Sequence, residues 1–313
     1  MIQKEPLIKQ FPNFLKLIFL VLVVLVCLLF TLIFGIFVAI PIFGPEVFSQ
    51  IMDLSEMSVL ENIELQKYFQ IVSQLGTFIF PALLFAFLVH RRIWDYLKLN
   101  IKPRLFTIIL ATLLIMAILP FINWLVQINE SLQLPEFMAG IEQWMRTSEE
   151  QAMKLTEAFL SDTSPGGFII NLLMIGMLAA IGEEFLFRGV ILRIFRDWTG
   201  NTHVAVWITA ILFSALHLQF FGFLPRMILG VVLGYMFVWS GSLWVPVITH
   251  FINNAAAVIV AYLYYRGEIK TDMESFGSTD NTAWIIGSLV MTLLLLITIY
   301  RYEKSNPKQT QIP

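Results

Sequence analysis

Three ionisable side chains interrupt an apolar stretch near the middle of the chain. Glu183, Glu184 and Arg188 lie in the segment 168–195, which otherwise has the composition of a helix buried in lipid. At the centre of a membrane helix, each Asp, Lys or Arg costs about 2.5–3.5 kcal/mol, and we expect a similar cost for Glu. Charged groups that cost this much need partners inside the protein, and they are functional candidates by default.

The spacing of these residues predicts different partners for the two glutamates. On an α-helix Glu184 and Arg188 are four residues apart and share a face, so an ion pair between them can partly offset their burial. Glu183 points about 100° away and stays free to act elsewhere. A salt bridge that fixes helix packing, assisted by the small Gly182 and Gly189, is the structural alternative. One arginine does not neutralise two glutamates, however, which weakens that alternative.

Two histidines and two asparagines lie in or near the apolar runs that follow. His217 and His250 are each at or near the end of such a run, where a lone histidine is more often a core side chain bonded to a backbone carbonyl. Asn254 follows His250 by one turn and shares its face, whereas Asn253 points elsewhere and is expected only to assist packing. The polar groups are therefore concentrated in one part of the chain, which predicts a polar site between neighbouring helices.

Such a set of side chains can perform three kinds of chemistry. It can bind a divalent ion, activate water for attack on a carbonyl, or relay protons. In hydrolysis Glu183 can act as the general base, while His and Asn side chains donate to the oxyanion. Two histidines and a glutamate can instead hold Zn²⁺ with one position open to water, so Glu183, His217 and His250 are also candidate zinc ligands. Residue types alone leave this choice open.

Membrane helices must position these groups. Of the 313 residues 58% are hydrophobic and 13% are charged, against about 25% charged residues in soluble domains. Apolar runs of about twenty residues match the thickness of a bilayer and predict an all-α, polytopic transmembrane bundle. The polar site is expected between its fourth and seventh spans. The eight predicted spans are 15–40, 69–89, 105–127, 168–195, 204–218, 227–240, 243–264 and 284–300.

Charged residues alternate along the connections between these spans. Basic residues dominate the N-terminus, segment 91–104, the residues after the fourth span and the C-terminal tail, whereas acids dominate the other long loops. By the positive-inside rule, this alternation predicts that both termini are cytoplasmic. The same bias suits a multi-pass protein of a bacterial cell membrane. Apolar side chains recur among the acids of loops 46–67 and 136–160, which predicts interfacial amphipathic helices on the outer side.

Nothing in the sequence divides the chain into two domains. We predict a single membrane domain, 1–313, in which 168–258 form the polar core, while 1–167 and 282–300 supply scaffold spans and outer amphipathic loops. Spans one, two, three and eight are expected to carry no buried charge. A net charge of −2 and the lack of a glycine-rich phosphate loop argue against a nucleic-acid partner and leave the lipid bilayer as the expected surroundings. The lone Cys27 excludes a disulfide framework and a thiolate zinc site.

Three motifs together resemble the signature of the CPBP intramembrane proteases. This family includes the type II CAAX prenyl endopeptidases and bacterial relatives linked to bacteriocin processing and self-immunity. The resemblance covers about residues 168–258, and the segment 241–247 before the last motif is also similar to the family pattern. The matching motifs are Glu183-Glu184-x-x-x-Arg188, Phe213-x-x-x-His217 and His250-x-x-x-Asn254.

The resemblance implies a membrane-embedded, CAAX-protease-like endopeptidase. Glu183 and His217 would activate the attacking water, and His250 and Asn254 would stabilise the oxyanion. A peptidase of this kind also requires Asn254 to matter while Asn253 is dispensable. Two other functions remain open, namely a non-catalytic membrane binding or immunity protein and an ion or proton transporter.

The resemblance also implies properties of the surrounding site. Glu184 and Arg188 would support the catalytic groups. Family members are usually called metalloproteases, although a metal-free glutamate mechanism has been argued, so Zn²⁺ is a candidate cofactor. The implied partner is a membrane protein or lipidated peptide substrate. In the prenyl-protein members the cavity opens to the cytoplasm, and the short cytoplasmic loops predicted here are compatible with such an opening.

Overall fold

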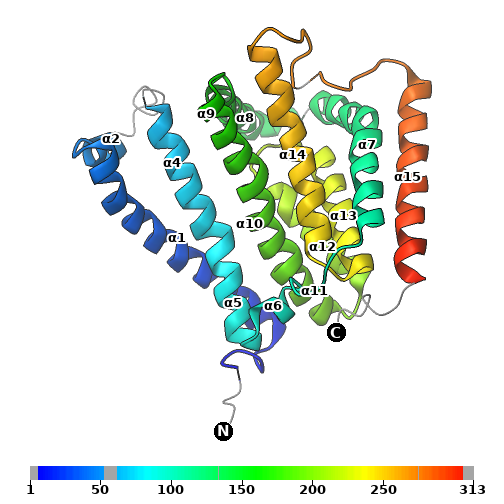
Figure 1. The fold of residues 1–313 in the computed structure, drawn as a ribbon, viewed down its shortest axis with the longest axis horizontal. Coiled ribbons are helices and arrows are strands. Elements are labelled where there is room, and N and C mark those ends of the chain that lie inside the picture. The colour runs from blue at the N-terminus through cyan, green and yellow to red at the C-terminus, as the bar shows by residue number, and fades with distance from the viewer. Residues whose placement is uncertain (1–5, 53–61, 133, 274, 306–313) are drawn as a thin grey trace.

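The computed structural model describes residues 6–52, 62–132, 134–273 and 275–305, which contain helices and no strand. This confirms the predicted all-α fold (Figure 1). The α-helices are α1 (Asn13–Phe43), α2 (Val47–Met52), α4 (Ile63–Gln74), α5 (Phe80–His90), α6 (Ile93–Tyr96), α7 (Leu105–Ser131), α8 (Ala139–Leu160), α9 (Pro165–Asn171), α10 (Ala179–Leu186), α11 (Leu192–Thr199), α12 (Thr202–Ala215), α13 (Phe223–Ser240), α14 (Trp244–Tyr265) and α15 (Thr282–Lys304).

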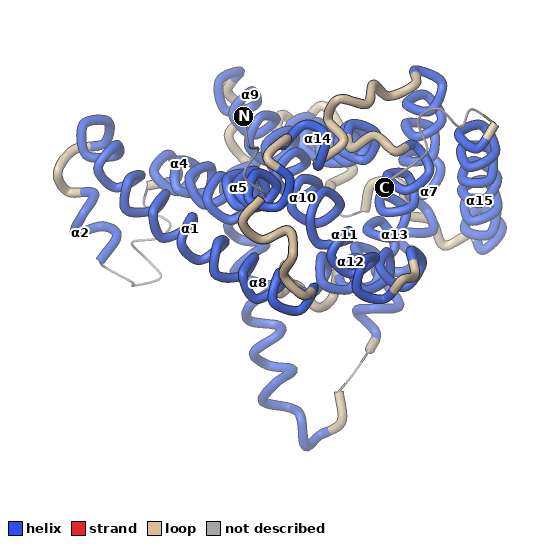
Figure 2. The backbone as a smooth tube through the Cα atoms, turned by 90° about the horizontal axis from the view of Figure 1, so that it is seen from below, coloured by secondary structure: helices blue, strands red, loops and turns tan. Residues whose placement is uncertain are grey.

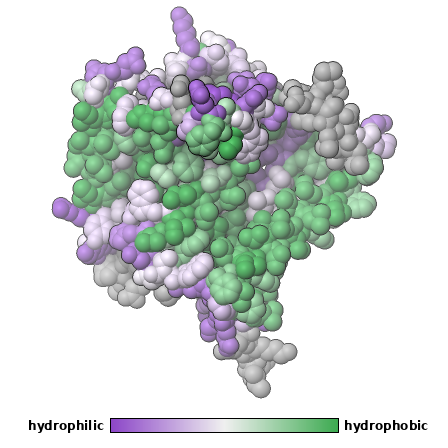
Figure 3. Space-filling model, turned by 180° about the vertical axis from the view of Figure 1, so that it is seen from behind, coloured by the Kyte–Doolittle hydropathy of each residue, from purple (hydrophilic) through white to green (hydrophobic). Residues whose placement is uncertain are grey.

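Among the described residues, seven helical segments are long and apolar enough to cross a membrane. A broad apolar surface with polar residues gathered towards its two ends agrees with this (Figure 3). The chain is therefore a multi-pass membrane protein. The predicted fifth span corresponds to α12, whose 14 residues reach only about 21 Å, against a hydrocarbon core of about 30 Å. Because α12 is short, the loop that follows it, with His217, begins before a full crossing is complete.

Two of the long spans contain π-helical stretches. Ile63–His90 joins α4 to α5 through Leu75–Ile79 (η1), and Pro165–Thr199 joins α9, α10 and α11. The second span is widened on both sides of α10, over Leu172–Leu178 (η3) and Phe187–Ile191 (η4). Such widened turns change the direction of the side chains around them and are frequent at functional sites.

Helix α10 lies at the centre of the bundle. It contacts α14 on one side and η1 with α5 on the other, while α15 packs on α7 at the edge (Figure 1). A Cβ at Gly182 would lie 2.9 Å from the Cβ of Phe78, and one at Gly189 would lie 2.7 Å from Cδ2 of Leu97. Both glycines thus permit close packing, as predicted. Helix α10 is thus packed against neighbours on both sides.

The two ends of the bundle differ in charge. The described parts of the N- and C-terminal segments lie at one end with α6 and α11 (Figure 1), where basic residues outnumber acids. We call this the basic end. The opposite end carries α2, α8 and the 266–281 loop, and we call it the acidic end. The helix predicted over 136–160 is confirmed by a 3₁₀ turn, Glu136–Met138 (η2), and by α8, which projects from the bundle (Figure 2). The helix predicted over 46–67 is described only at its two ends, because 53–61 lie outside the described residues.

The predicted spans one, two, three and eight carry no buried charge, but the helices that contain spans two and eight extend beyond them and bury one charge each. Lys67 in α4 is only 2% exposed and pairs with Asp162 at 3.2 Å. Glu303 in α15 is 1% exposed, pairs with Arg104 at 2.7 Å and accepts a hydrogen bond from Thr107. Both helices extend further than the apolar runs of the sequence indicate, and each charge is compensated by a partner distant in the chain.

Candidate active site

The predicted ion pair between Glu184 and Arg188 is present and fully buried. Nη1 of Arg188 donates to Oε1 of Glu184 over 2.6 Å, and both side chains are 0% exposed. Nη2 of Arg188 donates to the Gly230 carbonyl of α13 over 2.8 Å, and the guanidinium lies over the Phe213 ring of α12. One arginine therefore ties three helices together and leaves Glu183 without an arginine partner in contact.

Glu184 has a second partner that the sequence did not indicate. Its Oε1 also accepts a hydrogen bond from Nδ1 of His250 over 2.9 Å. A carboxylate only accepts, so this contact assigns the Nδ1 proton and directs the other ring nitrogen away from Glu184. That nitrogen, Nε2, lies 3.8 Å from Oε2 of Glu183. The two consecutive glutamates thus contact opposite sides of one imidazole ring.

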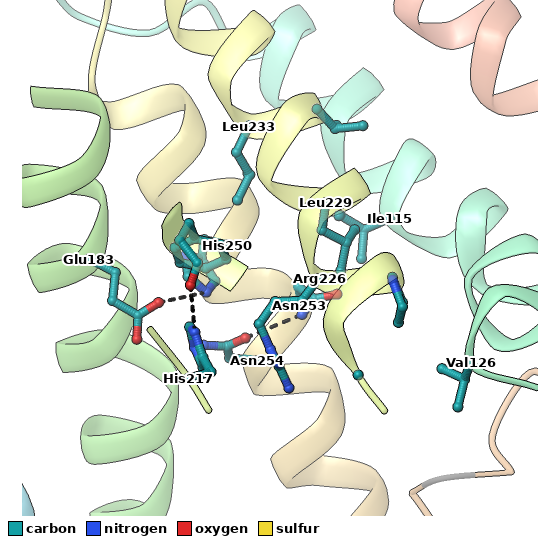
Figure 4. Close-up of a pocket in the computed structure, with 14 residues that line it drawn as sticks. Ile115, Val126, Glu183, His217, Arg226, Leu229, Leu233, His250, Asn253 and Asn254 are labelled. Atoms are coloured by element: carbon teal, nitrogen blue, oxygen red, sulfur yellow. Dashed lines mark hydrogen bonds and ion pairs between the residues drawn. The ribbon is translucent and has the colours of Figure 1, made fainter. Parts of the chain in front are cut away.

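Four predicted site residues meet in one cavity of about 320 Å³. Glu183 projects from α10, His250 and Asn254 project from α14, and His217 follows the end of α12 (Figure 4). His217 donates from Nδ1 to the Phe213 carbonyl over 2.8 Å, so its Nε2 is available within the cavity. The structure therefore brings Glu183, His217, His250 and Asn254 together around one cavity, while their roles stay predictions. The rest of the wall is largely apolar and includes Ile115, Leu229, Val232 and Leu233.

Asn253 does not point away from the site as expected. It lines the same cavity as Asn254, and its Nδ2 donates to Oδ1 of Asn254 over 3.2 Å. Asn254 in turn donates to the Ile175 carbonyl in η3 over 3.1 Å. Consecutive residues of a helix point about 100° apart. The cavity extends around more of the surface of α14 than this angle, so both asparagines line it. Asn253 therefore helps to hold Asn254 in place.

Arg226 is a cavity residue that sequence reasoning missed. It lies in the first turn of α13 and is bound by Gln219 through Nη2 to Oε1 at 2.8 Å and Nη1 to the backbone carbonyl at 3.2 Å. The signal was available, because an arginine begins an apolar helix directly after Pro225 at the acidic end.

The three candidate zinc ligands share this cavity without forming a metal site. The described part of the chain contains no group of three His, Cys, Asp or Glu side chains that could hold a metal ion. Nδ1 of each histidine is already bound, in His250 by Glu184 and in His217 by a backbone carbonyl. Nε2 of both histidines stays free of these bonds, and a histidine that donates from Nδ1 can bind zinc through Nε2, so a role for Zn²⁺ stays a prediction.

The cavity lies in the half of the bundle that faces the acidic end. Its lining residues on α13 come from the first part of that helix, and the loop residue Gly222 also contributes. Towards the basic end, the space is filled by Phe187, Phe237 and Leu243, which are almost completely buried. His217, Gly222 and Arg226 therefore mark the side from which the cavity is approached.

Comparison with known proteins identifies the segment that contains these residues. Residues 165–256 match the family model described as type II CAAX prenyl endopeptidase Rce1-like. The chain is 33% identical over 91 residues to the "Uncharacterized protein YpbD" of Bacillus subtilis (strain 168), a match that covers 28% of this chain and 43% of that protein. It is 35% identical over 102 residues to the "Uncharacterized 24.3 kDa protein" of Escherichia coli, covering 31% of this chain and 46% of that protein.

The matched region spans less than half of each of these relatives, and no solved structure matches the chain. The family match nevertheless includes all three motifs and every predicted site residue from Glu183 to Asn254. The predicted resemblance is confirmed over residues 165–256, which match the type II CAAX prenyl endopeptidase Rce1-like family model.

Proposed function

We propose that this protein is an intramembrane endopeptidase that hydrolyses peptide bonds of membrane-associated substrates. The observation that carries this proposal is the separation of the two glutamates. Glu184 is bound by Arg188 and His250, whereas Glu183 faces the cavity beside His217 and Asn254. Burying the Glu183 carboxylate costs free energy, and no arginine pairs with it. Such a carboxylate is suited to act as a general base. The family match supports the same reaction class.

The proposed reaction uses the cavity residues in named roles. Glu183 and His217 bind the attacking water, and Glu183 accepts its proton as oxygen attacks the peptide carbonyl. Asn254 and His250 donate to the oxyanion of the tetrahedral intermediate. For His250 this requires a proton on Nε2 in addition to the Nδ1 proton that Glu184 accepts. Glu183 then returns the proton to the leaving amine.

The expected partners are the lipid bilayer and a membrane protein or lipidated peptide. The family description supports a CAAX-type protease, and a prenylated peptide is one substrate class that this proposal includes. An apolar cavity wall beside lipid suits a substrate that arrives within the membrane. The proposal does not require a nucleic acid.

Comparison of peptide termini in membranes tests the proposal directly. Cells carrying the unaltered chain are compared with cells carrying Glu183→Gln at matched expression. The change keeps the side-chain shape and removes the base. We expect termini that depend on Glu183, and purified protein then shows whether they arise by direct cleavage. If the two sets of termini are identical while deletion of the chain has a phenotype, the function is binding or immunity and not proteolysis.

We further infer the orientation from the charge difference between the ends. With the basic end inside, both termini are cytoplasmic in a bacterial cell membrane, and the cavity is approached from the outer side. This departs from the cytoplasmic opening that the resemblance implied. It favours substrates whose scissile bond lies on the outer side over prenylated proteins confined to the cytoplasm.

Cysteine labelling of intact cells checks this orientation. Cys27 is first replaced by Ala, and a single cysteine is placed at Glu268 or Lys304, both of which are exposed. We expect a membrane-impermeant maleimide to label position 268, which lies at the acidic end, but to label position 304 only after lysis. Labelling of position 304 alone in intact cells would reverse the orientation.

The two asparagines are expected to contribute unequally to activity. Asn254→Ala removes an oxyanion donor and should lower kcat about 100- to 1,000-fold. Asn253→Ala removes only a neutral hydrogen bond to Asn254, worth about 0.5–1.5 kcal/mol, and should lower kcat about 2- to 10-fold. Steady-state kinetics of purified variants measure both effects. A larger loss from Asn253→Ala than from Asn254→Ala would contradict the assigned roles.

A further inference from the structure

Arg226 is a charged residue that lines the cavity and has no role in the proposed reaction. Its guanidinium is held by Gln219 through both the side-chain oxygen and the backbone carbonyl. Gly222 leaves room for it, because a Cβ at that position would lie 2.8 Å from Nη2 of Arg226. The side chain is therefore fixed in the wall of the cavity, and the close-up shows it among the lining residues (Figure 4).

Arg226 differs in its partners from three other cations of the bundle, whereas the buried Arg193 lies over the rings of Tyr96 and Phe237. Lys67, Arg104 and Arg188 each form an ion pair with a carboxylate. No ion pair joins Arg226 to a carboxylate within the described residues, and its two hydrogen bonds end on the neutral Gln219. A guanidinium carries five N–H donors, so donors remain for another acceptor.

Two carboxylates influence Arg226 from beyond contact distance. Glu183 and Glu149 both interact with it electrostatically. Glu149 is occupied by a hydrogen bond from the Phe221 backbone N–H at 3.2 Å, and Glu183 lies deeper in the cavity. An anion that binds in the cavity on the side of Arg226 would therefore contact its positively charged, partly desolvated guanidinium. Arginine is suited to bind a carboxylate in this geometry because two parallel N–H groups match its two oxygens.

We propose that Arg226, positioned by Gln219, is a specificity-determining residue that binds a carboxylate of the peptide substrate. The carboxylate belongs either to an Asp or Glu side chain near the scissile bond or to a free C-terminus close to it. This inference rests on the proposed peptidase function and adds the chemical class of substrate that the site selects.

The first test extends the comparison of membrane peptide termini to Arg226→Gln. Arg266→Gln is the matched control, because Arg266 is an exposed arginine at the same end that pairs with Glu268. We expect the termini that depend on Glu183 to derive from sites with a nearby carboxylate. Their abundance should fall about 10- to 100-fold in Arg226→Gln, as expected for loss of a charge-assisted hydrogen bond, and should be unchanged in Arg266→Gln.

Synthetic peptides built on the strongest such site then identify the source of the carboxylate. Purified full-length protein is given peptides with a free or amidated C-terminus, and with Glu or Gln at the acidic position. The unaltered protein should prefer one free carboxylate, and Arg226→Gln should lose that preference with its main effect on KM. Arg226→Lys should restore part of the preference, because it keeps the charge without the planar fork.

Two outcomes would overturn this inference while the peptidase function stands. The first is cleavage at Glu183-dependent sites that is unaffected by Arg226→Gln. The second is an equal loss for charged and neutral peptides, which would show a structural role for Arg226, and thermal unfolding in detergent would report that damage independently. If no terminus depends on Glu183, the peptidase function itself fails and this inference fails with it.

Discussion

Purified Glu183→Gln protein should hydrolyse its substrate about 100- to 10,000-fold more slowly than the unaltered chain, the range associated with loss of a general base. The amide cannot accept the proton of the attacking water. Its effect on stability should be small, because the contact of Glu183 with Nε2 of His250 is long, at 3.8 Å, and Arg188 is bound by Glu184. We expect kcat to fall while KM changes little, since the lost interaction belongs to the transition state.

Two further variants make this result specific. Glu183→Asp keeps the carboxylate but withdraws it by one methylene group, so it should retain more activity than Glu183→Gln and less than the unaltered chain. Glu157→Gln makes the same chemical change on the exposed face of α8 and should leave kcat unchanged. Single-turnover rates and thermal unfolding in detergent measure these effects. Full activity of a well-folded Glu183→Gln protein would remove Glu183 from the reaction.

Helix periodicity predicted those features of the site that depend on a single helix. The spacing of four residues placed Glu184 against Arg188, and the concentration of polar residues in the apolar runs placed His217 and His250 beside them. These predictions succeed because burying a charge in lipid is costly enough to restrict where it can lie. The resemblance to a known family added the order of the motifs.

Features that depend on contacts between helices could not be predicted in this way. The periodicity of a helix does not predict the width of a cavity. Asn253 was therefore assigned to packing although it lines the cavity. Helix periodicity also does not predict which side chain of another helix binds a carboxylate oxygen. The hydrogen bond between Glu184 and His250 was therefore missed. Lys67 and Glu303 were assigned to a loop and a tail because their helices extend past the apolar runs.

Arg188→Met should destabilise the protein by about 3–5 kcal/mol, the typical result of removing one partner of a buried ion pair. Glu184 would be left ionised at a position that is 0% exposed. Its Oε2 has no hydrogen-bond partner among the described residues, so Oε1 receives both Arg188 and His250. The loss of Arg188 also frees the Gly230 carbonyl. Thermal or denaturant unfolding in detergent measures the change.

A second substitution separates the structural task of this pair from its task in the reaction. Glu184→Leu combined with Arg188→Met removes both charges, and the double variant should be more stable than Arg188→Met alone, because apolar groups can replace a buried ion pair. Its activity should stay low, since Nδ1 of His250 loses its acceptor and the ring loses its orientation towards Glu183. Glu184→Gln keeps an acceptor for Nδ1 and should retain more activity than the double variant. Recovery of activity together with stability in the double variant would reduce the pair to a packing element, whereas recovery of stability alone would show that Glu184 positions His250.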